Sequence, residues 1–174
     1  MTRLALTLTI FLIGCNTTAG DTDTDDQDTG TPPAPVDGCI TNTNGDNFTS
    51  IQLALDEAES GDTLELCEGA LTEPVVITKD VTIVGAGSRK TTWAVTTDAD
   101  GNAINAEANI ITQGGVTVTI SGITFESTRS GIRVEGGTLN GDDLTFKSPG
   151  TYGIYGASAA INLTNSTVRK ADKG

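Results

Sequence analysis

The residues of this sequence best suited to chemistry are a group of carboxylates and arginines: Asp142, Asp143, Glu126, Arg129 and Arg133. On one shared face, the three acidic residues would offer a weak candidate site for Ca²⁺ or for proton transfer. Proton transfer, however, needs two groups whose surroundings separate their pKa values, and an exposed pair on a turn lacks that difference. Histidine, the commonest general base, is absent from the chain. We therefore expect a solvated turn at Asp142-Asp143, no resident cofactor and no catalytic residue.

The first of three cysteines follows a segment typical of targeting signals. Arg3 precedes the apolar run Leu4–Ile13, which is too short to cross a bilayer and ends at Gly14-Cys15. The tetrad Leu12-Ile13-Gly14-Cys15 resembles the bacterial lipoprotein signal. That resemblance implies a signal peptide over residues 1–14, palmitate-like acyl chains on Cys15, and anchorage in the outer membrane at the cell surface. The alternative is an ordinary secretory signal with an incidental cysteine.

The other two cysteines are expected to pair. With Cys15 lipidated, Cys39 and Cys67 remain as one pair in an exported, oxidising compartment. Their bridge would close a loop of about 28 residues and contribute roughly 3 kcal/mol. No Cys-x-x-Cys motif occurs, so we interpret the pair as a structural disulfide and not as a redox site.

Residues 15–38 form an acidic linker. The run from Asp21 to Gly30 and the Pro-rich run that follows contain almost nothing to bury, so the segment is predicted to be a disordered tether. Its aspartates lack the ligand spacing of a calcium loop. The whole chain has 10 basic and 23 acidic residues and a net charge of −13, which argues against nucleic acid as a partner.

The elements that must position these residues are written in a repeat. Segment 130–147 matches segment 152–169 after a shift of 22 residues, and a 21-residue shift matches its later part to 118–125. Such a period indicates a solenoid, whose units bury apolar side chains only against their neighbours. Gly, Asn and β-branched residues dominate, so residues 39–174 are predicted to form an all-β, parallel β-helix of about five coils. A β-sandwich, the alternative fold, would not explain the recurrence.

Within the repeat, like residues fall one coil apart. Asn140 and Asn162 are expected to form a ladder of stacked amides, and Gly131 and Gly153 to stack where a turn needs a positive φ or a close backbone approach. We interpret both pairs as structural. The acidic pair does not recur in this way, because Thr164 and Asn165 follow Asp142 and Asp143 by 22 residues.

One helix is predicted, over Ser50–Ser60. Thr49 or Ser50 can cap it, its apolar residues follow helical spacing, and Gly61 ends it. A single short helix before a strand solenoid is expected to cover the open end of the first coil. Binding of a partner by this helix is the alternative.

A resemblance to a known superfamily covers about residues 49–92. An Ala-rich helix, the opening Gly61-Asp62-Thr63, the strand Glu73–Ile77 and the segment Val81–Gly87 resemble the N-terminal end of right-handed β-helix proteins of the pectin-lyase-like superfamily. The resemblance implies a right-handed coil and includes polysaccharide hydrolases and lyases among its members. Their hydrolase set needs a Gly-His-Gly motif and their lyase set a recurring aspartate cluster, and this sequence contains neither.

These observations predict a membrane-anchored, surface-displayed module that acts structurally or binds carbohydrate or another surface protein. The alternative is a pectate-lyase-like or other polysaccharide-active enzyme, or an N-terminal fragment of one. After Val168 the sequence holds only the charged residues and small residues of 169–174, which are too few for a polar capping unit. We therefore expect a β-helix that is incomplete or uncapped at this end, where chains can associate end to end.

Overall fold

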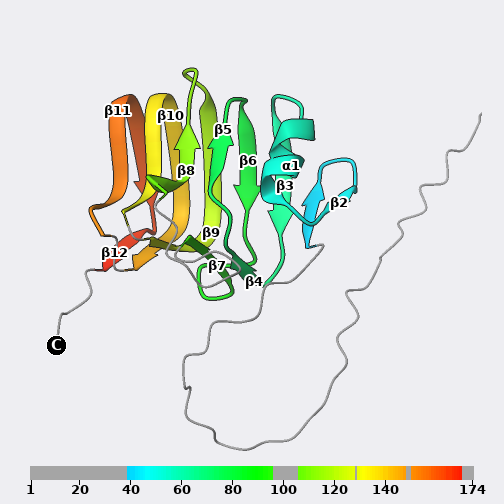
Figure 1. The fold of residues 1–174 in the computed structure, drawn as a ribbon, viewed down its shortest axis with the longest axis horizontal. Coiled ribbons are helices and arrows are strands. Elements are labelled where there is room, and N and C mark those ends of the chain that lie inside the picture. Colours follow the sequence, from blue (N-terminus) through cyan, green and yellow to red (C-terminus); the bar gives the residue numbers. More distant parts are fainter. Residues whose placement is uncertain (1–38, 96–105, 128, 148–149, 170–174) are drawn as a thin grey trace, which may run out of the picture. The chain divides into compact units, whose positions relative to one another are not determined.

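The computed structural model describes residues 39–95, 106–127, 129–147 and 150–169. These residues form a mostly β, parallel solenoid of about four turns with one short helix (Figure 1). The predicted signal peptide, the lipidation site Cys15 and the acidic linker lie outside the described residues. No helix in the described part of the chain has the length and hydrophobicity needed to span a bilayer.

The strands stack on three sides of the solenoid, all in parallel register. Side A contains β3 (Asp62–Leu66), β6 (Val81–Val84), the start of β9 (Thr117–Ser127), the later part of β10 (Ser130–Lys147) and the end of β11 (Tyr152–Thr164). Side B contains β4 (Gly69–Leu71), β7 (Thr91–Val95), the ends of β9 and β10, and β12 (Thr167–Arg169). Side C contains β5 (Val75–Ile77), β8 (Ala108–Thr112) and the starts of β10 and β11. Only four levels are complete on all three sides, one fewer than the predicted five.

The register confirms the repeat. Ile132 pairs with Ile154 at a step of 22 residues, and Val118 pairs with Leu139 at a step of 21. The first coil is divided differently from the prediction, which used 61–69, 73–77 and 79–87 as its three strands. The third of these opens the second coil as β6, because Leu64 pairs with Ile83. The strand that completes the first coil, β4, is only three residues long and too short to show an alternating pattern.

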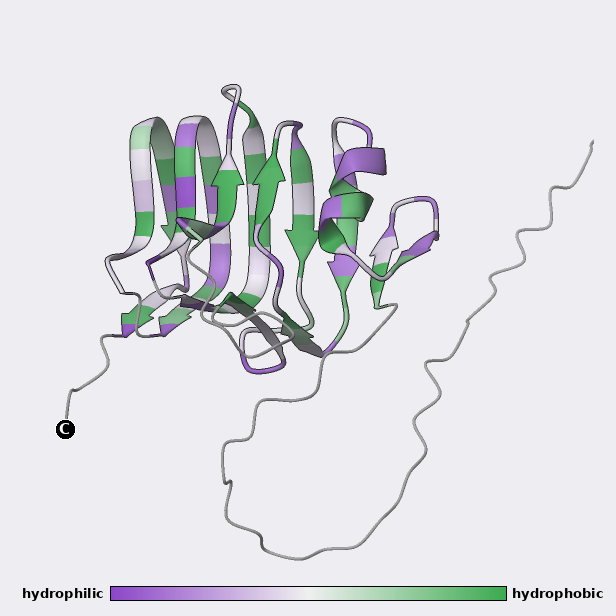
Figure 2. Ribbon diagram, viewed as in Figure 1, coloured by the Kyte–Doolittle hydropathy of each residue, from purple (hydrophilic) through white to green (hydrophobic). Residues whose placement is uncertain are grey.

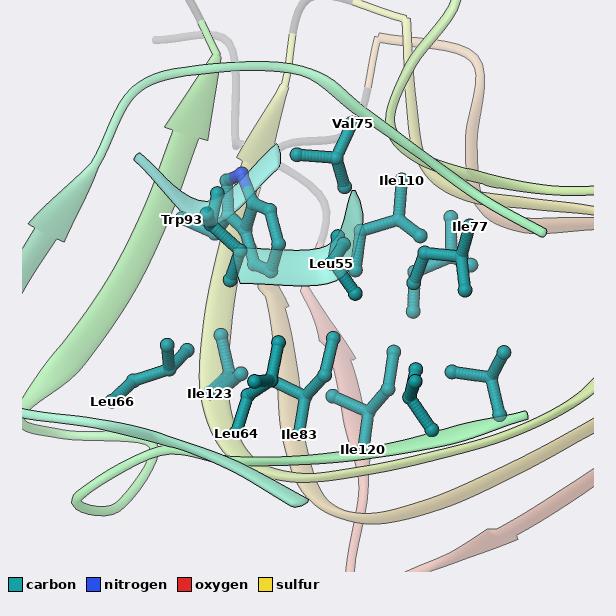
Figure 3. Close-up of a cluster of buried hydrophobic side chains, with 14 of the residues drawn as sticks. Leu55, Leu64, Leu66, Val75, Ile77, Ile83, Trp93, Ile110, Ile120 and Ile123 are labelled. Atoms are coloured by element: carbon teal, nitrogen blue, oxygen red, sulfur yellow. The ribbon is translucent and has the colours of Figure 1, made fainter. Parts of the chain in front are cut away.

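Stacking places like side chains above one another in the core. On side A, Leu64, Ile83 and Ile120 form a column of fully buried side chains (Figure 3). On side B, Trp93, Phe125 and Phe146 stack with ring centroids 6.0 and 5.2 Å apart. Because each level supplies one member of a column, an apolar core continues along the axis with few aromatic residues.

The helix is shorter than predicted. Helix α1 spans Ile51–Glu57, with Ser50 as its N-cap: the Ser50 hydroxyl accepts a hydrogen bond from the Leu53 amide at 3.2 Å. It ends at Ala58, three residues before Gly61, and buries Ile51, Ala54 and Leu55 against the core. Its apolar face therefore covers the first coil, as expected of a capping helix.

A small antiparallel sheet and a disulfide complete this end. Strand β1 (Ile40–Asn42) pairs antiparallel with β3 on one side and with β2 (Asn47–Phe48) on the other. The predicted disulfide joins Cys39 to Cys67, with their Cα atoms 5.3 Å apart. The bridge thus fastens the strand that covers side A to the end of the strand that it covers.

Candidate functional site

Asp142 and Asp143 lie at a corner between sides A and B, where their carboxylates bind other parts of the chain. Asp142 accepts hydrogen bonds from the Thr164 hydroxyl at 2.6 Å and from the Asn165 amide at 2.8 Å. These two bonds, the Thr164 bond first, hold the pKa of Asp142 below its ordinary value. Asp143 accepts from the Ser88 hydroxyl and amide, at 2.7 and 3.1 Å. Both carboxylates therefore link coils.

The backbone explains why an acidic pair stands at this corner. Gly122, Asp143 and Asn165 follow equivalent strand positions and have φ of 68°, 49° and 49°. Glycine, aspartate and asparagine are the residues that most readily adopt this left-handed conformation. Asp143 is thus chosen by the turn, as the sequence analysis expected of a structural position.

Glu126 is not part of the same cluster, so the shared face imagined for the three acids is wrong. Glu126 lies beyond the corner on side B, where its carboxylate pairs with Lys147 at 3.2 Å. Arg133 is on side C, in register with Tyr155. The corner at Gly122 separates Glu126 from the strand positions before it. Among the described residues, no three acidic or cysteine side chains are arranged to hold a metal ion.

The predicted stacked pairs lie next to each other. The Asn162 amide donates to the Asn140 side-chain oxygen at 3.0 Å. A Cβ atom added to Gly131 would lie 2.7 Å from the Gly153 carbonyl oxygen and 2.7 Å from the Phe146 ring. Neither Gly131 nor Gly153 has a positive φ. Close approach, rather than a turn conformation, therefore requires glycine here.

The outer surface of side A carries a polar column. Its members occupy paired positions on five successive strands: Thr63, Thr82, Thr119, Asn140 and Asn162. A shallow groove of about 540 Å³ runs beside the last three of them and includes Asp142 and Thr164. This surface offers hydroxyls and amides at regular spacing, which suits hydrogen bonding to a flat polar ligand.

A second and more distinctive pocket lies on side C. It has a volume of about 140 Å³ and is lined by Glu107, Arg129, Ser130, Arg133, Thr151, Tyr152 and Tyr155. Tyr152 and Tyr155 are 52% and 40% exposed, and their ring centroids are 5.7 Å apart. The Arg133 guanidinium lies 5.6 Å from the centre of the Tyr155 ring. We call this the tyrosine–arginine pocket.

Charges in the tyrosine–arginine pocket are already compensated. Arg133 pairs with Glu107 and, at 2.7 Å, with Glu135. Arg129 approaches the same Glu107 only to 4.0 Å, so its guanidinium is held loosely. The cluster of two arginines and two glutamates is neutral overall, and it presents donors and acceptors beside two aromatic rings.

Sequence reasoning missed the role of the two tyrosines. Register supplies the signal: Tyr155 falls 22 residues after Arg133, and Tyr152 falls 22 after Ser130, so their outward direction follows once the repeat is known. Glu107 reaches Arg133 across 26 residues because β8 and β10 are adjacent, and no short motif shows this. Comparison of the sequence with protein-family models and with curated proteins found no match.

Proposed function

We propose that this protein is a lipid-anchored, surface-displayed module that binds neutral carbohydrate in the tyrosine–arginine pocket. The observation that carries the proposal is the position of the two tyrosines. They are the only tyrosines in the chain, and both expose their rings in one pocket. The other described aromatic residues, Trp93, Phe48, Phe125 and Phe146, are buried. Exposed aromatic rings are favourable surfaces for recognition, since they combine apolar area with a polar tip.

The polar groups of the pocket favour sugar hydroxyls as ligands. Arginine offers only donors and an ionised glutamate only acceptors, and a hydroxyl can satisfy both. The loosely held Arg129 guanidinium lies at the edge of the pocket and can rotate toward a ligand without breaking a close ion pair. A sugar ring that packs on Tyr155 would place its hydroxyls beside Arg133 and Glu107.

Charge favours a neutral over an acidic polymer. The pocket's guanidiniums already face carboxylates, and the chain as a whole has a net charge of −13. A polyanion would meet repulsion from this net charge, which salt reduces at distances beyond about 10 Å. The polar column on side A would extend the contact surface for a longer glycan.

The setting of the module is part of the same proposal. The signal-like residues 1–14 and Cys15 support export and lipidation, the acidic linker to residue 38 supports a tether, and the parallel solenoid supports kinship with right-handed β-helix proteins of the pectin-lyase-like superfamily. Two or more acyl chains would anchor the protein stably. Substitution Cys15→Ser is expected to abolish incorporation of labelled palmitate and to move the protein from the outer-membrane fraction to the soluble exported fraction.

Binding is tested by affinity electrophoresis in gels that contain xyloglucan, galactomannan or polygalacturonate. We expect retardation by a neutral polysaccharide that is stronger than retardation by polygalacturonate. Tyr155→Ala should raise the dissociation constant roughly tenfold or more, since it removes a ring from the centre of the site. Thr82→Ala, an exposed substitution on side A away from the pocket, is the matched control and should retain binding.

Two outcomes would contradict the proposal. The first is the absence of retardation by any neutral polysaccharide in the panel, and the second is equal weakening by Tyr155→Ala and Thr82→Ala. The alternative from the sequence, a polysaccharide-active enzyme, is tested with the same preparation. Release of unsaturated or reducing ends from a polysaccharide, with or without Ca²⁺, would favour it over a binding module.

A further inference from the structure

The last coil of the described solenoid leaves an apolar end uncovered. Within the described residues, β11 pairs only with β10, and β12 also pairs only with β10. Ile161, Leu163 and Val168 are 38%, 41% and 61% exposed, and they line a hollow of about 720 Å³ with Tyr152 and Ile154. The ribbon of β11 is mostly green or pale in Figure 2, at the opposite end from α1. We call this surface the end rung.

The end rung lacks the features by which proteins protect a strand edge. Exposed edges are usually short, or contain lysine, proline or a bulge. Strand β11 is 13 residues long and contains no proline and no charged residue. Indeed, no charged residue occurs in the sequence between Lys147 and Arg169, although the chain has 33 charged residues. Small residues at 156–160 keep the edge flat. This edge is therefore composed for pairing.

The opposite end of the solenoid is closed to such pairing. On side A, β1 occupies the outer edge of β3. On side C, the Gln52 side chain takes the place of a strand: its oxygen accepts from the Val76 amide at 2.9 Å, and its NH₂ group donates to the Val76 carbonyl at 3.2 Å. Helix α1 covers the core between these edges. One copy therefore cannot add its end rung to this end of another copy, and head-to-tail growth is blocked.

We propose that the end rung binds the end rung of a second copy of this chain, about a two-fold axis perpendicular to the solenoid. An occupant must match strand edges on all three sides at once, and a second end rung has the same outline. In this arrangement the facing strands run antiparallel, which is a favourable pairing. The contact is isologous, so it closes at a dimer. Absence of charge on the end rung allows close approach of two chains that each have a net charge of −13.

Sedimentation velocity of the full chain over roughly a hundredfold range of concentration tests the proposal. We expect a monomer–dimer equilibrium and no larger species. Leu163→Lys should raise the dissociation constant roughly tenfold or more, because it places two copies of a charge in an apolar contact. Leu53→Lys is the matched control: Leu53 is also an exposed leucine, on α1 at the covered end, and its substitution should leave the equilibrium unchanged.

Hydrogen exchange of the unmodified chain gives a second readout that does not depend on how a variant folds. Amides of β11 and β12 should exchange more slowly as protein concentration rises, while amides of β1 and α1 should not respond. A monomer at every concentration would overturn the proposal, as would an open series of larger oligomers. Slow exchange of β11 that is independent of concentration would also overturn it, since another segment or a bound molecule would then cover the edge.

Discussion

The two ends of this solenoid solve the same physical problem to different extents. Each end coil presents apolar side chains and a row of peptide groups along the axis. At the first coil these are covered by β1, α1 and the Gln52 side chain. At the last described coil Ile161, Leu163 and Val168 stay exposed, and β11 has one strand neighbour. The difference shows that a cap consists of specific polar contacts as well as apolar cover.

The capping helix illustrates this point. Glu73, from the loop before β5, accepts hydrogen bonds from the amides of Ile51 and Gln52 at the start of α1. Lys79 donates to the carbonyls of Asp56 and Ala58 at its end, both at 2.7 Å. The negative and positive charges face the helix ends that they stabilise. A seven-residue helix too short to persist alone is thereby held by the coil beneath it.

The largest expected effect separates the interior of the core from the uncovered end. Phe125 and Val168 belong to the same column on side B, where Phe125 is fully buried and Val168 is the exposed last member. Phe125→Ala should lower the free energy of unfolding by about 3–5 kcal/mol, because it leaves a cavity between two rings. Val168→Ala should cost less than about 0.5 kcal/mol in urea titrations at low protein concentration. Equal losses would show that the end is covered in the monomer.

The next effect is that of the disulfide at the covered end. Replacement of Cys39 and Cys67 together by alanine should lower the free energy of unfolding by roughly 3 kcal/mol, since the unfolded chain loses a constraint on a loop of about 28 residues. Urea unfolding of the double variant, beside the parent protein with and without a reducing agent, measures the loss. A change under about 1 kcal/mol would mean that β1 covers β3 equally well without its covalent link.

A smaller effect is expected from the helix-capping carboxylate. Glu73→Ala should lower the free energy of unfolding by about 1–2 kcal/mol, because it removes the acceptor for amides at the start of α1. Glu68→Ala is the control, since Glu68 forms only an exposed pair with Lys90 at 3.5 Å and should contribute less than about 0.5 kcal/mol. If both variants unfold alike, α1 is held by its apolar face alone.

The smallest effect concerns the bonds that fasten the last coil. Hydrogen bonds from Thr164 and Asn165 lower the pKa of Asp142, so the folded state binds a proton less readily than the unfolded state. Its contribution to stability is therefore fully present above the ordinary aspartate pKa of about 3.9 and is lost as the pH falls through the lower folded pKa. Asp142→Asn should reduce the fall in stability on acidification below pH of about 4. An unchanged pH profile, measured by thermal unfolding, would contradict this role.

Repetition made the architecture predictable from sequence. A shift of 22 residues aligned Ile132 with Ile154 and Asn140 with Asn162, and each alignment became a strand pairing. The cysteine pair and the capping helix followed from equally local evidence. Strand β4 was missed, and the number of complete turns was one too high, because residues between 84 and 117 interrupt the period: Val84 pairs with Ser121 across 37 residues.

The candidate site was far less predictable. The acidic residues that stand out in the sequence are used to fasten corners, where a left-handed conformation selects Asp143 and the next coil engages Asp142. The tyrosine–arginine pocket, in contrast, combines β10 and β11 with Glu107 from the neighbouring coil. Nothing in the local sequence of Tyr152 and Tyr155 distinguishes rings that face solvent in a pocket from rings of a core.

By itself, the sequence determined what repeats: the length of a coil, the side chains that lie above one another, and the covalent link at the first coil. These follow from backbone periodicity, which acts over a few residues. Only the tertiary structure decided which side chains from separate coils meet, and which end of the stack is covered. Those outcomes depend on where each coil turns its corners and on how many levels are stacked, and both are set by packing between segments distant in the chain.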